Sequence, residues 1–184
     1  MKPVLREELL DWQTWSDRRA ERLSGFIDEK EARRVHLGDS ITFLFENHGT
    51  VLFQVQEMMR VERIVREAEI QHELDTYNEL LGGPGELGAT MLIEIDDPVR
   101  RAEVLPRWHG LPEHIYAVLP DGRRVAARFD ERQRDERRIS TVQFVKFPVG
   151  GVVPVALGVD HAELSVETRL TKVQRAALAA DLAG

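Results

Sequence analysis

Two apolar stripes that are out of phase share residues 58 to 81, and they constrain the fold more than any other feature of the sequence. The first stripe is Met58, Val61, Val65, Ala68 and His72, and the second is Ile70, Leu74, Tyr77 and Leu81. Each has the spacing of one helix face, but one straight helix cannot bury both against a single wall. We therefore expect a kink or break near Glu67 to Glu69. The "GGPG" that follows predicts the end of the helical segment, with Gly82 in the left-handed conformation and Pro84 preventing continuation.

The residues before these stripes allow two interpretations. "NHGTVLFQVQEMMRVERI" alternates at first like a strand and then follows a helical period. We predict a helix from about Thr50, with a strand through Gln56 as the alternative. Further upstream, residues 5 to 23 predict an amphipathic helix, and its stripe is Leu5, Leu9, Trp12, Ala20 and Leu23. The tryptophans Trp12 and Trp15 are expected to anchor packing.

Strand patterns occupy most of the remaining chain. Alternating apolar residues predict strands in "SITFLFE" at 40–46, "ATMLIEI" at 89–95 and "ISTVQFVKF" at 139–147. "HIYAVLPDGRRVAARF" predicts a hairpin that turns at Pro120 to Gly122, and "VVPVALGV" and "AELSVET" predict a last pair of strands. Asp97 and Thr171 are expected to cap helices that begin directly after them. The charged "DERQRDERR" at 130–138 is expected to be a short helix or a loop.

Together these patterns predict an α+β fold. A mostly antiparallel sheet packs against a long, kinked helical segment, with further helices at the N- and C-termini. The 184 residues fit one domain, 1–184, with a helical N-terminal segment at 1–35 and an α+β core at 36–184.

Composition narrows the function classes. The chain has no cysteine, which removes disulfides, thiolate nucleophiles and cysteine-ligated metal sites. The formal net charge of −7 argues against a nucleic-acid partner, because such proteins usually carry a basic stripe. The start of the chain has charges too early for a signal peptide, and "VGGVVPVALGV" at 149–159 is too short to span a membrane. We expect a soluble, cytoplasmic protein without a membrane partner.

Glu69, His72 and Glu73 are candidate metal ligands, because Glu-x-x-His spacing on a helix occurs in carboxylate-bridged metal sites. His161, in the predicted turn with Asp160, is a further candidate ligand or general base. However, the sequence holds no second Glu-x-x-His, and Arg66 offsets the field of the nearby carboxylates. We favour the alternative, a solvated acidic face with a partly buried His72. No cofactor is predicted, and a bound divalent metal stays the alternative.

A polar set on the helical segment is the main candidate for ligand binding: Gln54, Glu57, Arg60, Arg63 and Asn78. Such groups usually form a solvated face, but they can line a pocket if the sheet covers them. The glycine-rich "GGPGELG" has no Gly-Lys-Ser/Thr and no Gly-x-Gly-x-x-Gly, so it does not qualify as a phosphate-binding loop.

Several strings carry a family resemblance. "ITFLFENHGTVLFQVQEMMRVERI", "IQHELDTYNELL", "ATMLIEI" and "LGVDH" occur in this order, and together the chain resembles the uncharacterised bacterial family named domain of unknown function 3501. The family has no established activity, so the resemblance carries over no catalytic residue. Through neighbouring genes it implies a partner that is a rubrerythrin-like iron protein or an iron–sulfur oxidoreductase, and a role near peroxide stress.

Three functions follow from these observations. The first is a non-enzymatic accessory or binding protein, associated with the redox partners that the resemblance implies. The second is a metal-binding enzyme or sensor that uses the Glu/His cluster. The third is a small-ligand binding module with a pocket between the long helical segment and the sheet.

Overall fold

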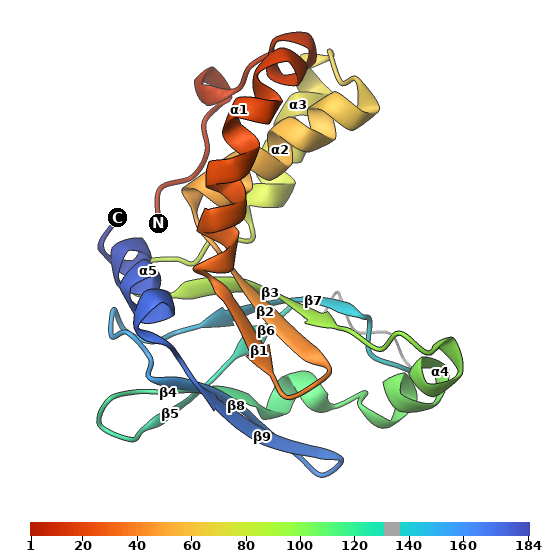
Figure 1. Ribbon diagram of the computed structural model, residues 1–184, viewed down its shortest axis with the longest axis vertical. Helices are drawn as coiled ribbons and strands as arrows, with labels where there is room; N and C mark the ends of the chain where they lie inside the picture. Colours follow the sequence, from red (N-terminus) through yellow and green to blue (C-terminus); the bar gives the residue numbers. More distant parts are fainter. Residues whose placement is uncertain (131–136) are drawn as a thin grey trace.

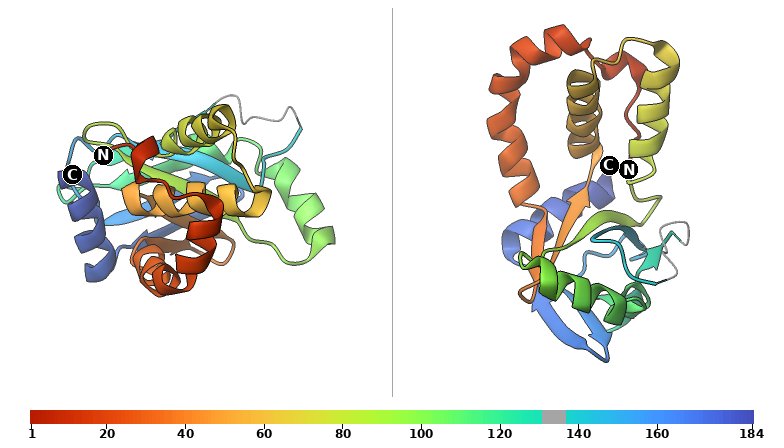
Figure 2. Two further views of the ribbon diagram at one scale, coloured as in Figure 1. Left: turned by 90° about the horizontal axis from the view of Figure 1, so that it is seen from above. Right: turned by 90° about the vertical axis from the view of Figure 1, so that its right-hand side faces the viewer.

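The computed structural model describes residues 1–130 and 137–184. Three helices form one end of the molecule, and the strands form a β body at the other end (Figure 1). The helical end consists of the 3-10 turn η1 (Arg6–Glu8), α1 (Trp12–Glu31), α2 (His48–Glu62) and α3 (Glu67–Asn78). Helix α2 lies between α1 and α3, as the side view in Figure 2 shows.

The β body contains two sheets. The first has the order β1-β2-β3-β7-β6, and its strands are β1 (Arg34–Leu37), β2 (Ile41–Glu46), β3 (Leu87–Ile93), β7 (Val142–Phe147) and β6 (Arg128–Phe129). The second has the order β5-β4-β8-β9, and its strands are β5 (Arg124–Ala126), β4 (Ile115–Val118), β8 (Ala156–His161) and β9 (Leu164–Arg169). Every pairing among the described strands is antiparallel. The remaining elements are α4 (Pro98–Arg107), η2 (Leu111–His114) and α5 (Lys172–Ala183).

The predicted fold class is therefore confirmed: the protein is α+β, with antiparallel sheets, a broken helical segment and helices near both termini. Two hydrophobic clusters support the two ends separately. One fills the β body around Phe43, Met91 and Leu157. The other fills the helical end around Val55, Met59 and Leu74.

The break in the helical segment falls slightly earlier than predicted. Helix α2 ends at Glu62, Arg63 adopts the left-handed conformation with φ 52°, and α3 begins at Glu67. The second apolar stripe is buried as expected, with Ile70 and Leu74 in the helical core. The prediction that the first stripe is a buried face was wrong, because Val61 and Val65 are 63% and 72% exposed. The helical core takes Val51, Val55, Met59 and Ile64 instead, and Val61, although it lies in α2 before the break, is on the solvent side. His72, expected to be partly buried, is exposed as well.

Other helical predictions were mostly right in type and less exact in position. Residues 50–56 are helical, so the strand alternative is wrong. The N-terminal helix begins at Trp12, because Asp11 caps it there, and Leu5 and Leu9 precede it. Ala20 is exposed, so it does not belong to the buried stripe. Trp15 is buried and packs edge-on against Phe53, which confirms its role as an anchor.

The glycine prediction needs a correction. Gly82 does not have a positive φ; Gly85, three residues later, has the left-handed φ of 73°. Gly82 is nevertheless required for close approach, since a Cβ there would collide with the backbone carbonyl of Glu86. Pro84 lies beyond the helix end, as predicted.

The strands and caps of the β body agree with the sequence patterns. Ile41, Phe43 and Phe45 are buried in β2, and the hairpin of β4 and β5 turns through Gly122. Asp97 accepts hydrogen bonds from the Val99 and Arg100 amides, and Thr171 and Gln174 form a capping box. The β8–β9 pair begins at Ala156, later than the predicted start, because residues 152–155 are not strand. Most of the charged connection at 130–138 lies outside the described residues.

Candidate ligand-binding pocket

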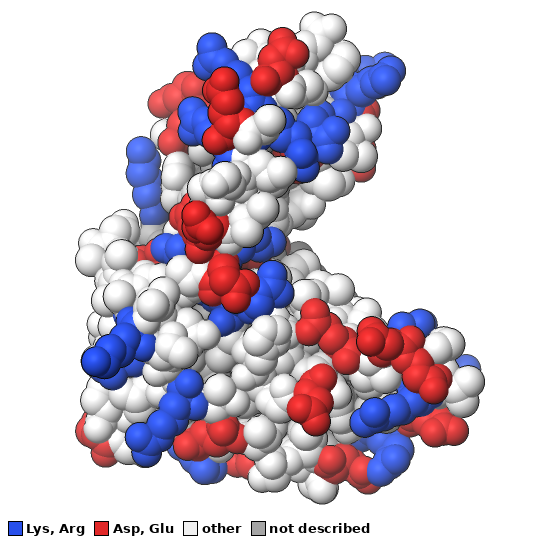
Figure 3. All heavy atoms as spheres, in the orientation of Figure 1, with Lys and Arg blue, Asp and Glu red and all other residues white. Residues whose placement is uncertain are grey.

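A cavity of about 840 Å³ lies between α3 and the strands β6 and β7. We name it the α3–β7 pocket. It is lined by His72, Thr76, Tyr77, Glu79, Leu80, Arg128, Phe129, Asp130, Phe144, Val145 and Lys146. The molecule narrows between its helical end and its β body, as the space-filling view in Figure 3 shows. The pocket thus forms where two separately packed parts of the chain meet.

Local periodicity explains which side chains reach the pocket from each wall. His72, Thr76 and Leu80 are four residues apart, so α3 and the turn after it present them in one row. On β7, Phe144 and Lys146 lie two residues apart and emerge on the same face, whereas Val145 and Phe147 point into the β core. The helix face and the strand face thus enclose the cavity from opposite sides.

Two cations stand side by side at the β wall of the pocket. Arg128 of β6 is the direct cross-strand partner of Lys146 of β7. The Arg128 guanidinium is paired with Glu86, at 3.1 Å between Nη2 and Oε1. The Lys146 ammonium has no ion pair within 4.0 Å in the described part of the chain. The carboxylates of Glu79 and Asp130, which also line the pocket, both already interact with other groups.

Tyr77 brings a polar group to the helical wall. Burial raises the pKa of its hydroxyl above the ordinary value of 10.0, and the nearby charges of Glu73 and Glu62 raise it further. The hydroxyl is therefore held in its neutral, proton-donating form. It makes no hydrogen bond to any residue that the structure describes.

The predicted polar set does not gather in this pocket. Glu57 faces α1, where its carboxylate accepts hydrogen bonds from Trp15 at 2.8 Å, Arg19 at 2.9 Å and Arg60 at 3.1 Å. Burial opposes ionisation of Glu57, but the hydrogen bonds from Arg60, Trp15 and Arg19 outweigh it and lower its pKa below 4.5.

The other three members of the polar set have separate contacts. Gln54 lies 3.5 Å from the Glu46 carboxylate, and the Arg63 guanidinium lies over the Trp12 ring. Asn78 donates to and accepts from the backbone of Val4, which fastens the N-terminal segment to α3. The five side chains therefore do not converge on one site.

The candidate metal ligands do not form one site: Glu69, His72 and Glu73 lie on α3, whereas His161 lies at the end of β8. Glu69 is exposed and lies 3.4 Å from Arg66, and His72 lines the α3–β7 pocket. His161 lies at the β8–β9 hairpin, at the opposite end of the molecule from α3, where its ring packs edge-on against His114 (Figure 1). Within residues 1–130 and 137–184, no three His, Asp or Glu side chains are grouped so that they could hold a metal ion.

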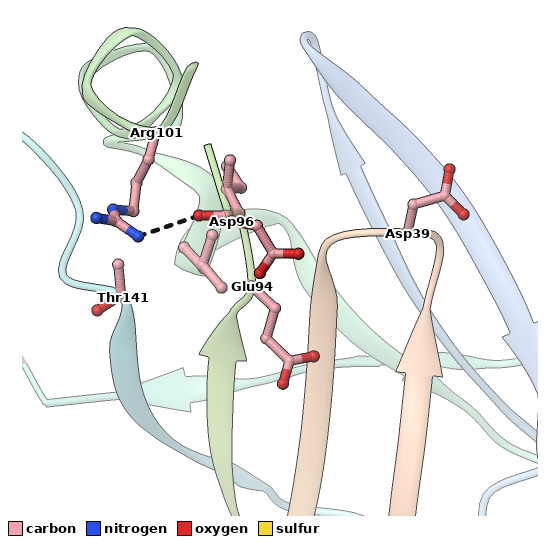
Figure 4. Close-up of a pocket in the computed structure, with 7 residues that line it drawn as sticks. Asp39, Glu94, Asp96, Arg101 and Thr141 are labelled. Atoms are coloured by element: carbon pink, nitrogen blue, oxygen red, sulfur yellow. Dashed lines mark hydrogen bonds between the residues drawn. The ribbon is translucent and has the colours of Figure 1, made fainter. Parts of the chain in front are cut away.

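A second hollow, of about 690 Å³, lies at the end of β3 (Figure 4). Its polar lining includes Asp39 from the β1–β2 turn and Glu94 and Asp96 from the segment after β3. Figure 4 shows that these three carboxylates point in different directions. Glu94 already accepts a 2.5 Å hydrogen bond from Thr42, and Arg101 donates to the carbonyl of Ile95. The α3–β7 pocket, with its apolar and aromatic walls, is the stronger candidate for binding a small molecule.

Sequence reasoning missed the pocket residues Tyr77, Arg128, Phe144 and Lys146. A signal for two of them exists, since Phe144 and Lys146 alternate with the core-facing residues of a predicted strand. The pattern places them on the face away from the β core, but it does not reveal that α3 covers this face.

The fold and the pocket together define an α+β protein with a ligand-sized cavity between a helical end and an antiparallel sheet. A family model described as a protein of unknown function, DUF3501, matches residues 3–182, so the chain belongs to this family. A crystal structure of a novel protein of unknown function from Burkholderia pseudomallei K96243 is similar over 98% of this chain and 100% of that chain. The TM-score is 0.90 and the sequence identity is 28%. No curated protein matches the chain. None of the helices in the described residues is long and apolar enough to cross a membrane.

Proposed function

We propose that this protein is a binding protein rather than an enzyme, and that it holds a small organic molecule in the α3–β7 pocket. The observation that carries the proposal is the cavity itself, about 840 Å³ between a helix and a sheet. This lies within the range of about 300 to 1,000 Å³ that is typical of small-molecule sites.

The lining supports the same function. Aromatic and aliphatic side chains from both walls supply apolar surface: Tyr77, Leu80, Phe129 and Phe144. A few polar groups, including Thr76 and Lys146, supply directional contacts. This combination of mostly apolar walls and a few converging polar groups is the usual composition of a ligand site.

The position of the pocket also favours binding. The helical end and the β body have separate hydrophobic clusters, and the pocket lies between them. A molecule in the pocket touches both parts, so its binding energy stabilises their native arrangement. Ligand occupancy would then be sensed by a partner that contacts both ends.

A fluorescence titration tests this function. N-phenyl-1-naphthylamine, an uncharged dye that brightens in apolar sites, should bind saturably to the purified protein. Phe144→Ala should weaken binding by about tenfold or more, because it removes the largest apolar group of the β7 wall. Val142→Ala is the matched control: Val142 is 40% exposed and Phe144 39%, and both lie on the same face of β7, but Val142 does not line the pocket. Absence of saturable brightening, or equal effects of both variants, would contradict the proposal.

Association with a rubrerythrin-like iron protein or an iron–sulfur oxidoreductase stays a prediction that only the family resemblance supports, as does a cytoplasmic location. A pull-down from cells that express such partners tests the association, and recovery of no iron or redox protein counts against it. The metal-binding alternative is tested by elemental analysis of untagged protein. A substoichiometric metal content ends that alternative.

A further inference from the structure

We infer that the molecule recognised in the α3–β7 pocket is an organic anion, with an apolar or aromatic body and one anionic group that pairs with Lys146. This inference rests on the proposed function and deepens it by naming the class of ligand.

Arg128 and Lys146 are direct partners across two antiparallel strands. Cβ atoms of such partners are about 5 Å apart, and like charges at this position repel each other. Glu86 neutralises one member of the pair, since its carboxylate lies 3.1 Å from the Arg128 guanidinium. Lys146 has no such partner among the described residues, so its charge is available to a ligand.

The other charged groups of the pocket also bear on the charge of its ligand. Its carboxylates, Glu79 and Asp130, are already engaged in interactions with other groups. The Tyr77 hydroxyl keeps its proton, because burial and the carboxylates of Glu73 and Glu62 raise its pKa. The described lining groups that are not already engaged are the Lys146 cation, the hydroxyls of Tyr77 and Thr76, and the His72 ring; none of them is a carboxylate, which suits an anion.

Apolar surface lies beside the cation. Phe144 precedes Lys146 by two residues on the same face of β7, so its ring lies next to the ammonium stem. Tyr77 and Leu80 lie on the opposite wall. A ligand with a flat apolar body can lie between these walls while its anionic group reaches Lys146. A free inorganic anion would use only half of the lining.

Two dyes that differ by one anionic group test the inference. 8-Anilino-1-naphthalenesulfonate and N-phenyl-1-naphthylamine share the same aromatic body, and only the first carries a sulfonate. The quantity measured is the ratio of their affinities. In Lys146→Met this ratio should shift against the sulfonate dye by about tenfold, the change expected for loss of one charge-assisted hydrogen bond. Lys172→Met, an exposed lysine on α5, is the control and should leave the ratio unchanged.

The outcomes separate the two proposals. If neither dye binds, the proposed function fails and the inference fails with it. If both dyes bind and Lys146→Met leaves their affinity ratio unchanged, the anion inference is wrong while the pocket stands. Competition gives an independent readout: 1-naphthoate should displace the uncharged dye more effectively than 1-naphthol from the wild-type protein, and Lys146→Met should abolish this difference. Equal displacement from the wild-type protein would overturn the inference.

Discussion

The guanidinium of Arg33 and the carboxylate of Asp181 form a buried, two-pronged ion pair that joins the end of α1 to the C-terminal helix α5. Nε and Nη2 of Arg33 each lie 2.8 Å from an oxygen of Asp181, and both residues are 8% exposed. Asn47 at the start of α2 also donates to Asp181, at 3.2 Å. The pair therefore ties together three segments that are far apart in the sequence.

Removing Asp181 from this pair should be strongly destabilising, because the buried Arg33 guanidinium then keeps, among the described residues, only Glu29, whose carboxylate lies 3.8 Å away, to offset its charge. Asp181→Ala should lower the free energy of unfolding by about 3 kcal/mol or more. The double variant Arg33→Met with Asp181→Leu should lose less than Asp181→Ala alone. Denaturant unfolding measures both variants, and a double variant at least as unstable as Asp181→Ala would refute the explanation.

A close contact between sheet neighbours gives a second prediction. Tyr116 of β4 is the cross-strand partner of Gly158 of β8, and a Cβ at Gly158 would collide with the tyrosine ring. Gly158→Ala should therefore lower the free energy of unfolding by about 1 to 3 kcal/mol. Gly110→Ala is the control, since nothing lies within 4 Å of a Cβ at that position. A side chain without the ring should relieve the clash, so Tyr116→Leu added to Gly158→Ala should recover part of the loss; no recovery would point to a different cause.

The left-handed conformation of Arg63, where the helical segment breaks, gives a third prediction. A non-glycine residue in the left-handed region is strained by roughly 1 kcal/mol, and Arg63 has φ 52° and ψ 44°. Arg63→Gly and Arg63→Ala both remove the contact between the guanidinium and Trp12, but only glycine relieves the strain. The glycine variant should therefore be the more stable of the two by about 1 kcal/mol. Thermal unfolding compares them directly, and equal stabilities would argue against a strained break at this residue.

Glu57 should contribute to the acid sensitivity of the protein. Its pKa is lowered in the folded state by hydrogen bonds from Arg60, Trp15 and Arg19, which overcome the opposing effect of burial. A carboxyl whose folded pKa is depressed adds stability above its ordinary pKa of 4.5, and this stability is lost as the pH falls through the lowered value. Glu57→Gln should therefore destabilise the protein more at pH 7 than at pH 3.

The control for this prediction is Glu21→Gln, which changes an exposed carboxylate of α1. Its effect on the free energy of unfolding should be small, because the side chain is exposed. If Glu57→Gln has the same effect at both pH values, the hydrogen bonds to Glu57 do not favour its ionised form.

Much of the fold could be predicted from the sequence because its signals are local. Three predicted features that depend only on neighbouring residues are present in the structure. They are the alternation in residues 41–46, the Asp97 cap and the Thr171–Gln174 capping box. Val61 and Val65 were mispredicted as packing residues, because apolar spacing shows only that an apolar face exists. Which face of a helix packs inward depends on the segments that lie beside it.

The α3–β7 pocket could not be predicted from the sequence, because no single segment contains both of its walls. The walls of the α3–β7 pocket come from residues 72–80 and 128–146, which meet only when the helical end is placed over β6 and β7. Lys146 is a candidate anion-binding residue because its cross-strand partner, Arg128, is already paired with Glu86. These relationships are set by strand register, and a sequence pattern shows alternation without register.

The most direct test of the central claim, that the α3–β7 pocket holds an organic anion, is a crystal structure of the protein with 8-anilino-1-naphthalenesulfonate. We predict the aromatic body between Phe144 and the α3 side chains, with the sulfonate within about 3 Å of the Lys146 ammonium. A dye bound elsewhere on the protein, with only solvent in this pocket, would contradict the claim.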